Sequence, residues 1–237
     1  MTGTFINTGA ILLGGTIGLL LGSRLADSIK RTVISGLGLF TLVYGISLFL
    51  KTQNALIVLG SLLLGILVGE WWRIEEGFGN LGVWLEKKFN KGNQSDDQEK
   101  FIKGFLTATL VFCIGPMAIL GSIEDGLTGN VNTLVVKSVL DGFGAMAFAS
   151  SLGIGVLFSG IIVLIYQGGI TLLAAQVQAI ATPVMMTELT ATGGVILVGM
   201  ALSGLLEIKK IRIASFLPSL IIAPLIVFLI AYLTPLK

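Results

Sequence analysis

Histidine is absent from this chain, and cysteine occurs once, as Cys113. These two facts exclude an intramolecular disulfide, a zinc site built from cysteine and histidine, and a Ser-His-Asp triad. No glycine-rich loop ends in Gly-Lys-Ser/Thr, which argues against nucleotide hydrolysis. We therefore expect a protein that is not an enzyme and that holds no cofactor or metal. No lysine or arginine precedes the first apolar run, so we expect residues 5–22 to be a retained helix and not a signal peptide.

Charged residues are also scarce. They make up 12% of the 237 residues, whereas hydrophobic residues make up 54% and gather in long runs. About 20 apolar residues in a helix cross the ~30 Å hydrocarbon core of a bilayer, so such runs predict transmembrane helices. Glycine is abundant, at 32 residues, and in membranes it lets helix backbones approach closely. The net charge of +2 is too small to indicate a nucleic-acid partner.

The hydropathy pattern predicts an all-α polytopic membrane protein with about eight transmembrane helices. The predicted spans are residues 5–22, 33–50, 55–70, 104–121, 132–150, 153–173, 190–206 and 213–235.

The basic residues predict the orientation of these spans. Twelve of the fifteen lysines and arginines fall in the connections between spans 1 and 2, 3 and 4, and 7 and 8. Only Lys51, Lys137 and Lys237 lie elsewhere. By the positive-inside rule the side with the twelve basic residues is cytoplasmic. We therefore expect a bacterial plasma-membrane protein with both termini outside.

Residues 71–103 form the only stretch that looks soluble. Trp71, Trp84 and Phe89 share one apolar face with other large residues, and acidic and basic residues oppose them. This pattern predicts a helix that lies on the cytoplasmic membrane surface. Residues 91–98 are expected to form a flexible polar linker. We thus predict one membrane domain over 1–237, with a three-helix part (1–70), the amphipathic segment (71–103) and a five-helix part (104–237).

The sequence also contains a weak internal similarity between residues 8–13 and residues 192–197. Small residues four apart recur in three inward-running helices: Gly14/Gly18/Gly22, Ser61/Gly65/Gly69 and Gly199/Ser203. A duplicated packing unit would explain both features, and so would the general similarity of apolar, glycine-rich helices. Such small-residue faces predict tight helix packing and could support a homo-oligomer.

Polar residues inside spans four and five mark the candidate site. Pro116, after Gly115, removes a backbone donor and should kink span four. Asp141 lies about 13 Å into span five, near the middle of the bilayer. Lys137 is one turn away on the same face, so the two can pair, with Ser138 beside them. Buried charges of this kind typically mark a substrate or ion path, although a self-neutralised structural pair is the alternative.

Gln167 in span six lies at about the same depth as Asp141 and Pro116. We therefore expect a small polar pocket bordered by spans four, five and six, with Asp141 lining it. Glu124, Asp125 and Glu188 are expected to form an acidic outer mouth that favours cations. Residues 176–188 could form a re-entrant segment or an interfacial lid.

Several motifs resemble the bacterial YdfK/YqgA-like inner-membrane family, a family of unknown function. The motifs are Cys113–Gly126, Lys137–Gly142, Phe148-Ala149, Tyr166–Gly169, Glu188–Gly194, Ile208–Ile211 and Leu217-Pro218. The resemblance covers essentially the whole chain and implies a plasma-membrane protein with a suggested transport role but no known substrate. Cys113 joins the candidate residues because it falls within a matched motif.

Taken together, these features favour a secondary transporter for a small solute or ion, with the lipid bilayer as its other partner. An ion channel would need the same buried residues but no alternating access. A membrane assembly or regulatory protein would need only the glycine faces and the amphipathic segment. All three functions remain open at this point.

Overall fold

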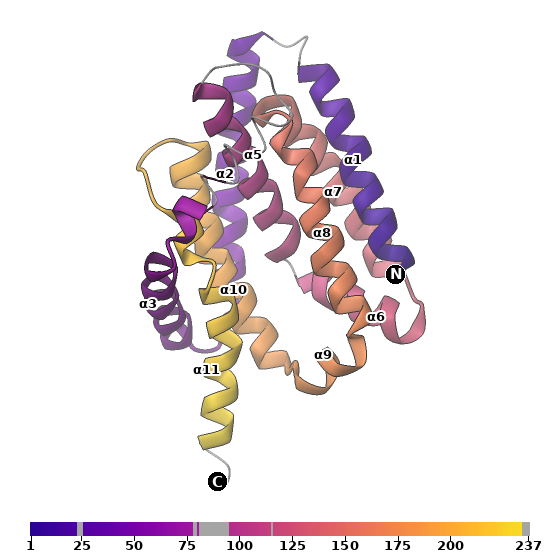
Figure 1. Cartoon of the computed structure of the whole chain (residues 1–237), viewed down its shortest axis with the longest axis vertical. Helices are drawn as coiled ribbons and strands as arrows, with labels where there is room; N and C mark the ends of the chain where they lie inside the picture. The colour runs from indigo at the N-terminus through magenta and orange to yellow at the C-terminus, as the bar shows by residue number, and fades with distance from the viewer. Residues whose placement is uncertain (23–25, 78–79, 81–94, 115, 234–237) are drawn as a thin grey trace. The chain divides into compact units, whose positions relative to one another are not determined.

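The computed structural model describes residues 1–22, 26–77, 80, 95–114 and 116–233, and this part contains helices and turns but no strand (Figure 1). The α-helices are α1 (Thr2–Gly22), α2 (Asp27–Phe49), α3 (Ala55–Trp71), α5 (Ser95–Ile114), α6 (Pro116–Thr128), α7 (Asn132–Leu152), α8 (Gly155–Leu172), α9 (Ala174–Ile180), α10 (Pro183–Met200) and α11 (Ser219–Leu233). A π-helix (Ala201–Leu205) continues α10, and a 3-10 helix (Ile213–Phe216) precedes α11.

The helices confirm an all-helical membrane fold. Six are long and apolar enough to cross a bilayer: α1, α2, α7, α8, α10 with its π-helix, and α11 with its 3-10 helix. The bent pair α5 and α6 makes a seventh if it counts as one span, and α3 is a shorter apolar helix of 17 residues. Each predicted run thus corresponds to a helix or a helix pair, while the count of eight spans and the internal repeats stay predictions.

The predicted fourth span is bent as expected but begins earlier. It comprises α5 and α6, whose axes differ by 59°, so the kink expected near Pro116 is present. The helix also begins earlier than predicted, because residues 95–98 belong to α5 and are not a linker. Gly115 lies outside the described residues.

The connection after α8 is also more helical than expected. Residues 174–180 form α9, and α10 begins at Pro183, well before the predicted start at residue 190. Thr182 is the N-cap of α10, since its hydroxyl accepts a hydrogen bond from the Met185 amide at 3.2 Å. Proline is favourable in the first turn because no amide donor is needed there, so Thr182-Pro183 starts a helix. The re-entrant or lid role of residues 176–188 stays a prediction.

The predicted amphipathic surface helix falls largely outside the described residues. Residues 74–77 and 80 are helical, and residues 81–94 are not described. Its place on the membrane surface therefore stays a prediction.

The chain divides into two compact units, one of residues 1–37 and 81–180 and the other of residues 38–80 and 181–237. These boundaries do not follow the three consecutive parts predicted within one membrane domain, and that division stays a prediction. Each unit combines segments that are far apart in the sequence, so its core depends on contacts between early and late helices.

In the first unit, α1 lies beside α7 over most of its length (Figure 1). Gly14, Gly18 and Gly22 of α1 face the backbones of Gly142, Met146 and Ser150 of α7. The contacting residue numbers increase by four along both α1 and α7, so the two helices are parallel. A Cβ atom at Gly18 would lie 2.3 Å from the Met146 carbonyl oxygen, which leaves space only for glycine. The first small-residue ladder thus packs inside the unit, as predicted for tight packing.

In the second unit, α11 packs against α3 and α10. Gly65 and Gly69 of α3 face the backbones of Ser219 and Ser215, so the residue numbers run in opposite directions along the two segments. Ser61 is also fully buried. The second ladder therefore packs within the chain as well. A homo-oligomer stays a proposal, and it would need a surface other than these two ladders.

We predict that Gly18→Ala lowers the stability of the protein, because the new methyl group would meet the Met146 carbonyl oxygen. The expected loss is about 1–3 kcal/mol, as for other overpacked contacts. Gly9→Ala on the same helix is the matched control, since no atom lies within 4 Å of the Cβ position there. Thermal unfolding of both purified variants in detergent measures the difference. Equal melting temperatures for the two would contradict the close α1–α7 contact.

Candidate functional site

An ion pair on α7 is the centre of the candidate site. The Lys137 ammonium is hydrogen-bonded to Oδ2 of Asp141, one turn further along the helix. Their side chains are only 6% and 9% exposed. The Phe112 ring of α5 lies beneath the ammonium, with 6.0 Å between Nζ and the ring centroid. The pairing predicted from the four-residue spacing is thus present, and it neutralises two charges that would be very costly to bury singly.

Two amide side chains from other helices extend this pair. Asn7 of α1 donates from Nδ2 to Asp141 Oδ2 at 2.9 Å and to Gln167 Oε1 of α8 at 3.2 Å. Both Asn7 and Gln167 are fully buried. Asp141 and Gln167, which sequence analysis placed at similar depths, are therefore joined through a residue of the first helix. We call Lys137, Asp141, Asn7 and Gln167 the polar cluster.

Several buried polar atoms, two of them in the polar cluster, have no hydrogen-bond partner among the described residues. These atoms include Oδ1 of Asn7, Nε2 of Gln167 and the hydroxyl oxygen of Thr8, all of them inaccessible to solvent. Buried polar groups in folded proteins are nearly always paired, because an unpaired one costs about 1–3 kcal/mol. The polar cluster thus retains one unused acceptor and one unused donor on neighbouring amides.

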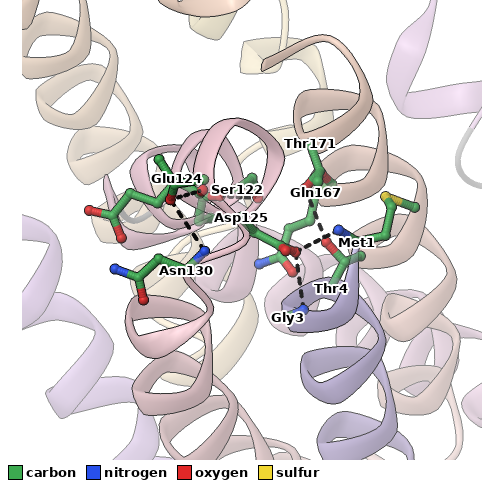
Figure 2. Close-up of polar contacts among 11 residues, drawn as sticks. Met1, Gly3, Thr4, Ser122, Glu124, Asp125, Asn130, Gln167 and Thr171 are labelled. Carbon is green, nitrogen blue, oxygen red and sulfur yellow. Dashed lines mark hydrogen bonds and ion pairs between the residues drawn. The ribbon is translucent and has the colours of Figure 1, made fainter. Parts of the chain in front are cut away.

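A chain of hydrogen bonds continues from Gln167 toward the start of α1 (Figure 2). Thr171 donates its hydroxyl proton to the Gln167 carbonyl at 2.8 Å, so in its 3.3 Å contact with Thr4 it acts as the acceptor. Thr4 and Asn7 share the buried face of α1. This face is polar for its first two turns and then continues with Ile11 and the glycine ladder.

The other predicted site residues make no hydrogen bond to the polar cluster in the described part of the chain. Ser138 is buried on α7, but its hydroxyl donates to the Leu134 carbonyl of the same helix at 2.6 Å. Cys113 is a free, half-buried cysteine near the end of α5. Pro116 is the first residue of α6, and its side chain is outside the described part, as is Gly115. The structure therefore does not describe how Gly115-Pro116 relates to Asp141.

Two of the three acidic residues expected at an outer mouth are buried. Asp125 of α6 is only 5% exposed, and its Oδ2 accepts from the Gly3 amide at 3.0 Å and lies 2.9 Å from the amino group of Met1 (Figure 2). It therefore caps the first turn of α1. Glu124 is partly buried and accepts from the Thr133 hydroxyl at 2.7 Å.

Glu188 binds the segment that precedes α3 in the second unit. Its carboxylate is fully buried and accepts from the Thr52 hydroxyl at 2.5 Å and from the amides of Gln53 and Asn54 at 2.8 and 3.1 Å. These donors lie directly before α3, so Glu188 anchors the start of that helix. The prediction that Asp125 and Glu188 form part of an exposed acidic mouth does not fit their burial, because Asp125 caps α1 and Glu188 binds the segment before α3.

Asn7, which connects the three helices, was not among the residues predicted from the sequence. The sequence feature that could have indicated its role is a single carboxamide side chain in the apolar first helix, one turn after Thr4. An isolated asparagine could equally face a neighbouring helix or lie near the membrane surface, so its partner was not evident from the sequence.

Comparison with known proteins identifies relatives over almost the whole chain. Residues 2–228 match the family described as "Protein of unknown function (DUF554)". The chain is 36% identical over 221 residues to "Uncharacterized protein YqgA" of Escherichia coli (strain K12), covering 93% of this chain and 94% of that protein. It is 30% identical over 234 residues to "Uncharacterized membrane protein YdfK" of Bacillus subtilis (strain 168), covering 97% of each. No solved structure matches.

We predict that Asp141→Ala and Lys137→Ala each destabilise the protein by about 3–5 kcal/mol, because each leaves its partner charged, buried and unpaired. The loss of stability in the double variant should be much smaller than the sum of the losses in the two single variants. Unfolding in detergent measures all three, with exposed Val139→Ala on the same helix as the control. Strictly additive losses would show that the two charges do not interact.

Proposed function

The chain belongs to the DUF554 family of unknown function, and on that premise we propose that it is a secondary transporter of a small solute or ion in the bacterial plasma membrane. The polar cluster is the proposed binding site. The observation that carries the proposal is the buried Lys137–Asp141 pair, which Asn7 connects to Gln167 while polar atoms of both amides remain unpaired.

The energetics of the ion pair favour this function over a purely structural role. A buried ion pair often adds no stability over apolar residues of similar volume. Three membrane helices could therefore pack at least as well without it. Polar and ionisable residues inside a membrane usually mark the path of a substrate, an ion or a proton. The pair is better explained by a solute that it binds than by the fold that it supports.

The burial of the polar cluster favours a carrier over a channel. Asn7 and Gln167 have no exposed surface, and the two charged side chains are less than one-tenth exposed. A permanently open pore would keep its lining residues in contact with water. An occluded site requires the surrounding helices to move before a solute can enter or leave, as alternating access does. The assembly alternative draws less support, because the first two glycine faces are used within the chain.

A transport assay tests the proposal directly. Proteoliposomes are loaded with a defined mixture of polyols, amides, amino acids and inorganic ions, and mass spectrometry measures what each preparation retains over time. We expect at least one solute to leave faster than from protein-free liposomes, and Asp141→Asn to abolish that difference because the asparagine cannot pair with Lys137.

Trans-stimulation then distinguishes a carrier from a channel. Unlabelled solute outside the liposomes should accelerate efflux of the labelled solute, because a loaded carrier returns faster than an empty one. Efflux through a channel would not respond in this way. If proteoliposomes with the wild-type protein retained every solute as well as protein-free liposomes do, the proposed function would be contradicted.

We further propose that both termini face outward, because twelve of fifteen basic residues gather in connections assigned to the cytoplasm. Single cysteines at Thr2, Lys51 and Ser95 test this orientation in a Cys113→Ser background. In intact cells, a membrane-impermeant maleimide should label the cysteines at positions 2 and 51, whereas position 95 should react only after permeabilisation. Labelling of position 95 in intact cells would reverse the orientation.

A further inference from the structure

We propose that the polar cluster selects an uncharged solute that both donates and accepts hydrogen bonds, such as a small polyol or a primary amide. This inference rests on the proposed transport function, which by itself does not distinguish a neutral solute from an ion. It follows from the charge balance of the site and from the chemistry of its unpaired atoms.

The charges of the polar cluster are already balanced. Lys137 and Asp141 neutralise each other, and Lys137 is the only basic side chain bonded to Asp141 in the described part of the chain. Asp125, the buried carboxylate at the start of α1, is already bonded to the Gly3 amide and the Met1 amino group. A cation or anion that entered this site would bring a charge with no counter-charge, and such a charge is strongly disfavoured inside a membrane.

The unpaired atoms instead match a neutral molecule with two kinds of hydrogen-bonding group. Oδ1 of Asn7 can only accept, and Nε2 of Gln167 can only donate. They belong to amides that are already linked at 3.2 Å, so both belong to one buried cluster. A hydroxyl group or a carboxamide supplies the complementary donor and acceptor.

The assigned orientation of the two amides is consistent with this chemistry. Nδ2 of Asn7 faces two acceptors, Asp141 Oδ2 and Gln167 Oε1, so the amide of Asn7 cannot be reversed without placing its oxygen against both. Its free atom is therefore the oxygen. The free atom of Gln167 is the nitrogen, since its oxygen accepts from Asn7.

Three probes with the same three-carbon skeleton test the selectivity in proteoliposomes: uncharged glycerol, anionic glycerate and cationic 2-aminopropane-1,3-diol. Wild-type protein should accelerate efflux of glycerol over protein-free liposomes and leave both ions unaffected. Gln167→Leu should reduce the glycerol flux about tenfold, the usual effect of losing one hydrogen bond to a buried group. Ser159→Ala, a buried hydroxyl elsewhere on α8, is the matched control and should keep the flux.

Gln167→Glu provides a second readout that a structural role would not give. It keeps the shape of the side chain but adds a negative charge, so glycerol flux should fall and flux of the cationic probe should appear. Preferential transport of either ion by the wild-type protein, or an unchanged preference in Gln167→Glu, would overturn the proposed substrate class while leaving transport intact.

A binding measurement separates failure of this inference from failure of the transport function. The rise in melting temperature with glycerol or erythritol is compared between the wild type and Gln167→Leu, which cancels the general stabilising effect of polyols. A larger rise in the wild type without any flux would retain the solute class and refute transport. Equal rises in both proteins would refute the solute class, and would indicate that water satisfies the two amides.

Discussion

The close parallel contact between α1 and α7 determines where the polar residues of the first unit meet. Gly14, Gly18 and Gly22 let the backbone of α1 approach the carbonyl groups of α7. The same approach brings Asn7, at the start of α1, within 2.9 Å of Asp141. Larger residues in the ladder would hold the helices apart and separate the amide from the carboxylate. The glycines are thus needed for the geometry of the polar cluster as well as for packing.

A second constraint concerns the ends of the helices. The first amides of a helix have no partners within it, and in an apolar environment they must be satisfied by other groups. In the first unit a buried carboxylate from another helix, Asp125, accepts from the Gly3 amide in the first turn of α1. In the second unit Asn54 caps α3, and the buried Glu188 carboxylate in turn accepts from the amides of Gln53 and Asn54. Acidic residues that sequence analysis assigned to a solvent-exposed mouth therefore hold helices in place, and this removes the main argument for a preference for cations.

The sequence predicted most of the helices because long apolar runs in a membrane protein have few alternatives. The small-residue faces and the Lys137–Asp141 pair were predicted from helical spacing alone, and contacts within one helix depend only on that spacing. Contacts between helices were harder to predict. The choice of α1 as the partner of α7, and with it the role of Asn7, depends on three-dimensional packing of segments separated by more than a hundred residues. The early start of α10 was missed because Thr182-Pro183, which caps the helix, was interpreted as part of a loop. The early start of α5 was missed because its first residues are polar.

The central claim is that the buried ion pair exists for a solute and not for the fold. Replacing both charges with apolar residues of similar size, as in Lys137→Met/Asp141→Leu, tests it most directly. Asn7 would keep its bond to Gln167 and lose only its bond to Asp141, so no buried charge is left behind. Stability and solute efflux are measured on the same purified preparation. The account predicts a melting temperature at or above that of the wild type together with loss of transport. Wild-type transport by this variant would contradict it.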